Sequence, residues 1–213
     1  MYIPRSNAET RPDVMHDFMT AYPFAALVTV TPEGPFATHL PLVLDRSRGP
    51  FGTLEGHVAR ANPQHRESRP GVDALVIFSG PNAYISPSWY PSKAAHGQVV
   101  PTWNYVAVHA YGPIRFRDDH DFLQRHLRAL TAEHEATRER PWAVTDAPAD
   151  FVAQQQRAIV GFELTISRLE GKWKMSQNRS AADIDGVTRG LASSASQNDR
   201  VVGDIVEQVR PHD

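Results

Sequence analysis

A basic residue followed by a helix start is the part of this sequence best suited to binding a phosphate. The segment GHVARANP, residues 56–63, places Arg60 after a predicted strand and just before Asn62-Pro63, a pair typical of a helix N-terminus. Such a terminus offers unpaired N–H groups and partial positive charge, and a guanidinium matches phosphate oxygens. The segment therefore favours a monophosphate site at Arg60 and Asn62. The same residues also fit a simple helix cap beside a solvated surface charge, and this stretch alone does not separate the two.

Polar residues interrupt the preceding strand as well. In THLPL, residues 38–42, Thr38 and His39 break the apolar pattern of a predicted barrel strand. Pro41 removes a backbone donor, so we expect one edge of this strand to lack a neighbour. A flat heteroaromatic ring needs apolar faces and a few polar groups at its edge, which Thr38 and His39 could supply. For this segment taken alone, a hydrogen-bonded core histidine is the favoured explanation.

A third group of donors lies in KWKMSQNRS, residues 172–180, which contains Lys174, Gln177 and Arg179. Strand alternation puts Lys172 and Lys174 on one face, which allows a joint electrostatic role. Dense donors beside a tryptophan suit a phosphate or the edge of a ring. They suit any solvated strand end too.

Several kinds of chemistry are not indicated. The chain has no GxGxxG, GxxxxGK[ST], HExxH or GxSxG motif, and His120, His126 and His134 do not share a metal-binding spacing, so we expect no metal site. The absence of cysteine excludes disulfides, thiolate ligands and cysteine nucleophiles. The net charge of −2 provides no overall basic field for nucleic acid or an anionic membrane.

The elements that position these residues follow from periodicity and turn signals. We expect strands first, in closely spaced runs, with a hairpin around Pro32-Glu33-Gly34 and a long strand over 102–116. Helices are predicted over 11–21, 118–140, 148–159 and 198–209, and residues 179–194 look broken and partly helical. Residues 161–175 read as one half-buried strand.

This order favours an antiparallel architecture. The first strands are too close together for the crossover helices of a parallel sheet. We therefore expect a mainly β, α+β fold: a closed or half-closed barrel with peripheral helices. The expected parts are a core with an N-terminal helix over 1–117, a helical insertion over 118–160, and the last barrel strand with C-terminal helices over 161–213. The chain start lacks the apolar region of a signal peptide and no run is long enough to span a membrane, so the expectation is cytoplasmic.

Six segments together resemble the PaiB family, described as FMN-binding split-barrel proteins and negative transcriptional regulators. They are MYIP, HLPL, GHVARANP, ALVIFSGPNAYISPSWY, VPTWNYVAVHAYG and GFELTISRLEGKWKMSQNRS. They occur in order over nearly the whole chain, and residues 136–150 and the last dozen residues contribute little.

The resemblance implies a split β-barrel, a homodimer, and FMN in clefts at the subunit boundary. In the wider superfamily, which includes pyridoxamine-phosphate oxidases, a basic residue after the third strand binds the FMN phosphate, and by its place Arg60 is that residue here. The expected cofactor contacts are Thr38, His39, Leu40, His57, Arg60, Asn62, Trp89, Lys174, Gln177 and Arg179.

The resemblance also gives a hypothesis for residues 83–105, which carry five large aromatic residues among three prolines. These rings would wall the flavin cleft or cover the dimer seam, where each buries much apolar area at little conformational cost. The alternative is a loop pinned to its own domain by Trp89 and Trp103.

Three functions remain open at this point. The family description implies a regulator, with DNA as a partner, yet neither the charge nor any helix-turn-helix pattern supports base readout. An FMN-dependent oxidoreductase, similar to pyridoxamine-phosphate oxidases or flavin reductases, is the alternative. Its candidate acids and bases are His39, His57 and Tyr90. A flavin-binding module without turnover is the third.

Overall fold

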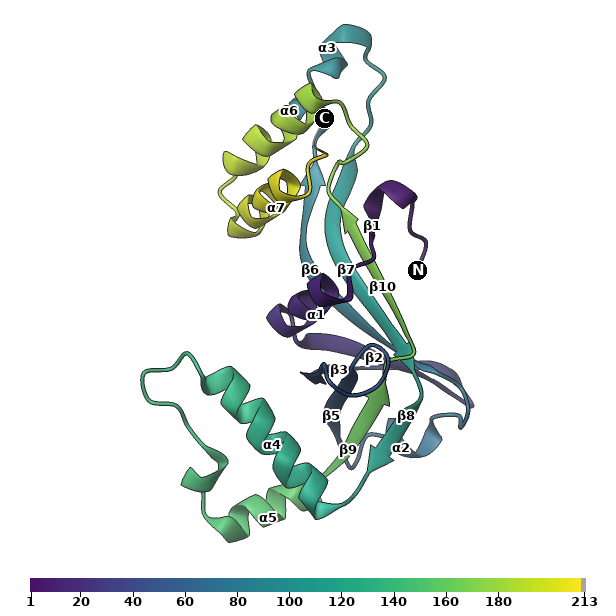
Figure 1. Cartoon of the computed structure of the whole chain (residues 1–213), viewed down its shortest axis with the longest axis vertical. Helices are drawn as coiled ribbons and strands as arrows, with labels where there is room; N and C mark the ends of the chain where they lie inside the picture. The colour runs from purple at the N-terminus through teal and green to yellow at the C-terminus, as the bar shows by residue number, and fades with distance from the viewer. Residues whose placement is uncertain (212–213) are drawn as a thin grey trace. The chain divides into compact units, whose positions relative to one another are not determined.

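A computed structural model of the chain describes residues 1–211, and these residues form two compact units (Figure 1). Unit 1 comprises Met1–Arg11, Ser79–Val108 and the chain from Glu170 onward, and unit 2 comprises Pro12–Phe78 and His109–Leu169. Three strands contribute residues to both units: β6 (Ala74–Ile85), β7 (Thr102–Gly112) and β10 (Arg168–Lys174). No helix within residues 1–211 is long and apolar enough to cross a membrane.

Unit 2 begins with helix α1 and the predicted hairpin, which is confirmed. Strands β2 and β3 pair antiparallel from Phe24 opposite Pro41 to Thr31 opposite Gly34. Gly34 has a φ of 121°, which a residue with a side chain rarely adopts, and it allows the turn after Pro32-Glu33. On its other side β2 pairs with β6, which leaves β3 as the edge strand of its sheet. The unpaired edge expected from Pro41 is therefore present.

A second sheet completes the β-structure of unit 2. Its strand order is β4-β5-β9-β8, and every neighbouring pair is antiparallel. The inward side chains of both sheets form the core, and the largest fully buried ones include Leu27, Leu54, Phe78, Phe162 and Leu164. The elements of unit 2 are α1 (Pro12–Ala21), β2 (Phe24–Thr31), β3 (Gly34–Pro41), β4 (Val43–Asp45), β5 (Thr53–Ala59), α2 (Gln64–Glu67), β8 (Ile114–Arg117), α4 (His120–Glu135), η3 (Val144–Asp146), α5 (Ala149–Arg157) and β9 (Ile159–Thr165).

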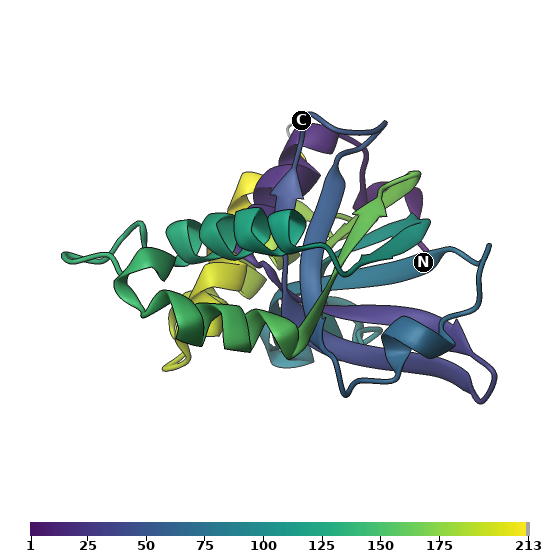
Figure 2. The same cartoon turned by 90° about the horizontal axis from the view of Figure 1, so that it is seen from below.

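Helix α4 lies against the four-stranded sheet because one stripe of its side chains is apolar. Asp119 caps its start by accepting a hydrogen bond from the Phe122 N–H at 2.9 Å. Phe122, Leu123 and His126 are buried, as the helical spacing predicts. A Cβ atom at Gly161 of β9 would lie 2.4 Å from the Phe122 ring, so the glycine permits the close approach of helix and strand. Figure 2 shows α4 and α5 running alongside each other.

Unit 1 contains the strand order β1-β10-β7-β6 and two C-terminal helices. Its elements, including the strands shared with unit 2, are η1 (Arg5–Asn7), β1 (Ala8–Glu9), β6 (Ala74–Ile85), η2 (Pro87–Trp89), α3 (Ser92–His96), β7 (Thr102–Gly112), β10 (Arg168–Lys174), α6 (Ala181–Ala192) and α7 (Gln197–Gln208).

Three expectations about the elements were wrong. The long strand predicted over 102–116 is two strands, because Pro113 cannot donate to the ladder. The single strand predicted over 161–175 divides at Ile166-Ser167, where the Ser167 N–H bonds the Tyr111 carbonyl at 2.9 Å. Residues 181–192 form a continuous helix, and Ser180 caps it by accepting a hydrogen bond from the Asp183 N–H.

Candidate functional site

Thr38 and Asn62 lie together in unit 2, and their polar groups bond each other and Gln64. The Asn62 amide donates to the Thr38 hydroxyl at 2.9 Å, and that hydroxyl donates to the Gln64 side-chain oxygen at 2.6 Å. The Asn62 side-chain oxygen accepts from the Gln64 N–H at 2.9 Å, which forms a local turn just before the short helix α2. These bonds hold the start of α2 against the β2–β3 hairpin.

Gln64 is a central residue that the sequence does not reveal. It is fully buried, and its Nε2 lies 3.1 Å from the Thr29 hydroxyl and 3.2 Å from the Leu27 and Phe36 carbonyl oxygens. A glutamine after Asn-Pro is an ordinary first-turn residue of an exposed helix. Only the fold shows that α2 points this side chain between two strands.

Successive side chains of β3 point to opposite faces of the sheet, so His39 and Leu40 lie on different faces. Leu40 is buried in the core, whereas His39 is exposed and stacks on Phe24, with ring centroids 6.3 Å apart and an interplanar angle of 24°. Phe24 is 65% exposed. His39 and Phe24 belong to a row of outward-facing side chains that is largely apolar and runs over β3, β2 and β6; we call this row the outer face. Its other members are Ala26, Val28, Val30, Ala37, Leu75 and Ile77.

His57 belongs to a histidine pair beneath α4. Its Nδ1 lies 3.0 Å from Nε2 of His126, which is fully buried and stacks on Phe122. Burial lowers the pKa of His57, and burial with the charges of His57 and Arg125 lowers the pKa of His126 to about 4. Both rings are therefore held neutral near pH 7. The contact between the two rings holds helix α4 against strand β5.

Arg60 is already paired with a carboxylate. Both of its terminal nitrogens bond Asp118, and its Nε donates to the Arg157 carbonyl at 2.7 Å. One terminal nitrogen also donates to the Ile159 carbonyl at 2.9 Å. The bonds to Asp118 raise the pKa of Arg60 and hold that of Asp118 below its ordinary value. A phosphate at Arg60 would have to replace the Asp118 carboxylate.

In unit 1, Trp89 packs on helix α6. A Cβ atom at Gly190 would lie 2.3 Å from the indole of Trp89, and one at Gly186 would lie 1.9 Å from its carbonyl oxygen. The Asp183 carboxylate of α6 accepts two hydrogen bonds from Ser92, one from its backbone N–H at 3.1 Å and one from its hydroxyl at 2.9 Å. This part of the aromatic segment is therefore fixed to its own unit.

The other end of that segment is open. Tyr84 and Trp103 form an edge-to-face pair with ring centroids 6.2 Å apart, and Trp103 is 53% exposed. Exposed aromatic rings of this kind are typical of surfaces that contact another molecule. The part of the segment around Trp89 therefore fits a loop pinned to its own unit, and the part around Tyr84 and Trp103 fits a surface that contacts another molecule.

Lys174 and Arg179 form a cationic cluster with Lys172. The Lys174 ammonium donates to the Thr102 hydroxyl and the Trp103 carbonyl, and the Arg179 guanidinium lies 4.8 Å from the centroid of the Tyr90 ring. Burial lowers the pKa of Lys174, and the charges of Lys172 and Arg179 lower it further. Within residues 1–211 none of the three forms an ion pair with a carboxylate.

Gln177 uses its amide within its own turn. Its side-chain oxygen accepts from the Met175 N–H at 2.7 Å, and its nitrogen donates to the Trp173 carbonyl. Ser176 between them has a φ of 65°. The amide stabilises the turn that carries Lys174 and Arg179 rather than reaching outward.

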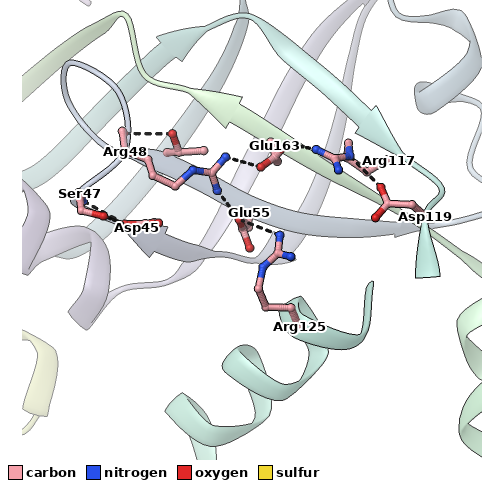
Figure 3. Close-up of polar contacts among 9 residues, drawn as sticks. Asp45, Ser47, Arg48, Glu55, Arg117, Asp119, Arg125 and Glu163 are labelled. Atoms are coloured by element: carbon pink, nitrogen blue, oxygen red, sulfur yellow. Dashed lines mark hydrogen bonds and ion pairs between the residues drawn. The ribbon is translucent and has the colours of Figure 1, made fainter. Parts of the chain in front are cut away.

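A separate ionic network occupies a 550 Å³ hollow on the four-stranded sheet (Figure 3). Glu55 and Glu163 are opposite each other on β5 and β9, and Arg48 bonds both carboxylates. Arg117 bonds Glu163 at 2.6 Å and Asp119 at 2.9 Å. Burial alone would raise the pKa of Glu163, but the bonds from Arg48 and Arg117 outweigh it and the pKa lies below its ordinary value. Every charge of this network is compensated, so we assign it to stability.

Replacing Arg48 with methionine is expected to lower the free energy of unfolding by about 2 kcal/mol. Breaking a fully buried ion pair costs about 3–5 kcal/mol, and solvent screening reduces this because Arg48 is 44% exposed. Urea denaturation at pH 7 measures the loss. The control is Arg46→Met, which removes an exposed pair with Asp17 and is expected to change stability by less than about 0.5 kcal/mol. Equal effects of the two variants would contradict the assignment.

Residues 1–168 match the sequence family described as "Putative FMN-binding domain". The chain is 32% identical over 207 residues to the "Protease synthase and sporulation protein PAI 2" of Bacillus subtilis, with 97% of each chain covered. It is 34% identical over 243 residues to an uncharacterised protein of Emericella nidulans, covering 98% of this chain and 97% of that one.

Two solved structures share the fold at low sequence identity. The flavocytochrome Anf3 from Azotobacter vinelandii has a TM-score of 0.57 at 15% identity, covering 81% of this chain and 72% of that chain. The FAD and heme binding protein from Mycobacterium smegmatis has a TM-score of 0.56 at 16% identity, covering 84% and 79%. With the antiparallel sheets described above, they confirm the expected split-barrel, α+β fold.

Proposed function

The chain belongs to the sequence family described as "Putative FMN-binding domain", and on that premise we propose that it binds FMN at the interface of a homodimer. FMN combines a flat three-ring system, a ribityl chain and a phosphate, so its site must offer an apolar surface, hydrogen-bond partners and a cation. When bound, the flavin supplies redox chemistry, and the protein positions it.

The observation that carries the proposal is the outer face of β3, β2 and β6. An antiparallel sheet with one solvated side normally alternates apolar and polar residues, but here the outward row is apolar as well. On β2 it consists of Phe24, Ala26, Val28 and Val30, all exposed or half-buried. Contiguous apolar surface of this kind marks a binding surface. It suits a flat ring system and a second copy of the chain.

Within unit 1, Lys174 and Arg179 are better suited to binding a phosphate than Arg60 is within unit 2. Charge-assisted hydrogen bonds from an ammonium and a guanidinium are the usual means of holding phosphate oxygens. The ammonium of Lys174 bonds only uncharged oxygens of Thr102 and Trp103, so a phosphate has no carboxylate to displace. Burial lowers the pKa of Lys174 most, and like-charge repulsion within the cluster lowers it further; an anion would relieve that repulsion.

Replacing Lys174 with methionine is therefore expected to weaken FMN binding at least about tenfold, because a hydrogen bond to a charged group contributes about 1.5–3 kcal/mol. Each variant is loaded with FMN and titrated by the flavin absorbance near ~450 nm. Arg60→Ala, which leaves the cluster intact, is expected to retain FMN. Lys93→Met, at an exposed lysine of α3, serves as the control for loss of charge alone.

Three outcomes would overturn parts of this proposal. Flavin loss in Arg60→Ala with retention in Lys174→Met would return the phosphate to Arg60, as the resemblance implies. A monomeric mass of the FMN-loaded protein by light scattering would refute the dimer interface. A wild-type protein that does not take up FMN would refute the cofactor.

We propose that an effect on transcription, which the PaiB resemblance implies, is exerted through the flavin or through protein contacts. Residues 193–196 join α6 and α7, but α7 carries Asp199, Asp204 and Glu207 against a single Arg200. DNA backbone binding requires a basic face, which this helix lacks. A gel shift at stated salt with non-specific competitor tests this, and a sequence-specific shift by the purified protein would contradict it.

An FMN-dependent oxidoreductase is the second candidate, and the position of His39 favours it. Of the three candidate acids and bases, Tyr90 is buried, His57 is paired with His126, and only His39 is exposed, as a member of the outer face. Bleaching of the bound flavin by NADH or NADPH supports turnover. A flavin that stays oxidised with both reductants supports a binding module.

A further inference from the structure

The buried face of strand β7 begins with a polar side chain. Asn104, Val106 and Val108 alternate with outward-facing residues, and all three are at most 2% exposed. An apolar residue at position 104 would continue the row without the cost of burying an amide. A buried amide needs a hydrogen-bond partner, and the identity of that partner indicates what the amide is used for.

The partner of Asn104 is Ser176, in the turn between β10 and α6. The Asn104 amide nitrogen donates to the Ser176 hydroxyl at 3.0 Å, and that hydroxyl lies 3.3 Å from the amide oxygen. Ser176 is buried and, with a φ of 65°, is the single non-glycine residue within 1–211 that has a positive φ. This left-handed conformation is unfavourable for a residue with a side chain, so the surrounding contacts must hold it.

The turn carries the two cations of the proposed phosphate site on either side of Ser176. Lys174 precedes it, and the ammonium bonds two groups of β7, the Thr102 hydroxyl and the Trp103 carbonyl. The Arg179 N–H donates to the Ser176 carbonyl at 3.0 Å, so the backbone at Arg179 depends on the conformation of Ser176. The charge of Arg179 is near enough to Lys174 to contribute to its lowered pKa.

We propose that Asn104 is a positioning residue of the phosphate site. By holding Ser176 in its left-handed conformation, it fixes the relative positions of Lys174 and Arg179. The inference rests on the proposed function, because it concerns the same phosphate, and all of these residues belong to unit 1. Asn104 is buried and does not reach a bound phosphate itself. It determines how well two cations meet one anion, and therefore how strongly the site prefers a phosphorylated flavin.

Riboflavin is the matched probe because it is FMN without the phosphate. Fluorescence titration of the full-length protein, freed of flavin, measures both affinities. The wild-type protein is expected to bind FMN at least about a hundredfold more tightly than riboflavin, about tenfold for each cation. Asn104→Ala is expected to reduce this preference at least about tenfold, with the affinity for riboflavin unchanged. Ser176→Ala, which removes only the hydroxyl, is expected to have the same effect.

A rescue variant separates positioning from general damage to the fold. Glycine adopts a positive φ without steric cost, so Ser176→Gly in the Asn104→Ala background keeps the turn without the amide. This double variant is expected to regain at least about fivefold of the preference, which corresponds to relief of about 1 kcal/mol at a left-handed residue. A merely structural role of Asn104 would lower the melting temperature and leave the ratio of the two affinities unchanged.

Two further variants distinguish the possible failures. Thr188→Val removes another hydroxyl of unit 1, bonded to Glu207 at 2.8 Å, and is expected to keep the wild-type preference. Lys174→Met is expected to lose the preference. If it kept the preference, the phosphate site proposed above would be wrong, and this inference with it. If Lys174→Met lost the preference but folded Asn104→Ala kept it, or if Ser176→Gly gave no rescue, this inference alone would be overturned.

Discussion

Gly186→Ala is expected to destabilise the protein by about 2 kcal/mol, although the same change stabilises most helices. Alanine is favoured over glycine inside a helix by about 1 kcal/mol. At this position, however, the new Cβ would lie 1.9 Å from the Trp89 carbonyl oxygen and 3.1 Å from Cδ of Pro91. The close neighbour is backbone, which cannot rotate away, so overpacking of about 1–3 kcal/mol or more outweighs the gain in helix propensity. We expect residues 86–97 to detach from α6.

The urea denaturation midpoint measures this change, and Gly203→Ala is the matched control. Gly203 is also a buried helical glycine, in α7, but its Cβ would meet only Cβ of Leu191, at 3.3 Å. That variant is expected to be neutral or slightly stabilising. If Gly186→Ala were as stable as Gly203→Ala, Trp89 would not be seated on α6 as described.

The second large effect is a loss of stability in mild acid that originates at His126. Its folded-state pKa of about 4 lies below the unfolded value of 6.5, so between these values the unfolded chain binds more protons. Stability is therefore complete above about pH 6.5 and falls as the pH drops to about 4, by about 3 kcal/mol in total. About 2 kcal/mol of this is already lost at pH 5. Protonation of His126 would place a positive charge in the buried space beside Phe122, and burying an unpaired charge is unfavourable.

Urea denaturation at pH 7 and pH 5 measures this loss. His126→Leu is expected to have a smaller difference between the two conditions than the wild type. His134→Leu, an exposed position on the same helix, is expected to keep the wild-type difference. Identical differences in all three proteins would show that another group controls the acid response.

Local patterns were enough to predict much of the fold. The hairpin at Gly34 and helix α4 each follow from neighbours in sequence, through turn chemistry and helical spacing. The resemblance to the PaiB family, carried by six segments in order, is confirmed by the family match and by the PAI 2 relative. The ends of the long strands were missed because strand periodicity does not report where pairing partners change.

The surroundings of the candidate site residues could not be predicted in the same way, because they depend on contacts between distant segments. Arg60 and Asp118 are 58 positions apart, and nothing near Arg60 in the sequence indicates that a carboxylate takes the place expected for phosphate. The seat of Trp89 depends on Gly186 and Gly190, which read in sequence as helix-breaking residues. Lys174 and Arg179, by contrast, belong to one short segment, and their grouping was visible from the outset.

The edge strand β3 has a consequence for how many copies can associate. A free edge with regularly spaced N–H donors invites strand after strand to join, and such growth has no natural end. The prolines near the two ends of β3, Pro35 and Pro41, lack those donors and leave only a short stretch of edge available. Growth of the sheet by addition of strand after strand at this edge is therefore disfavoured. The homodimer proposed above would use the broad outer face instead of the edge, and such an association need not continue into a fibre.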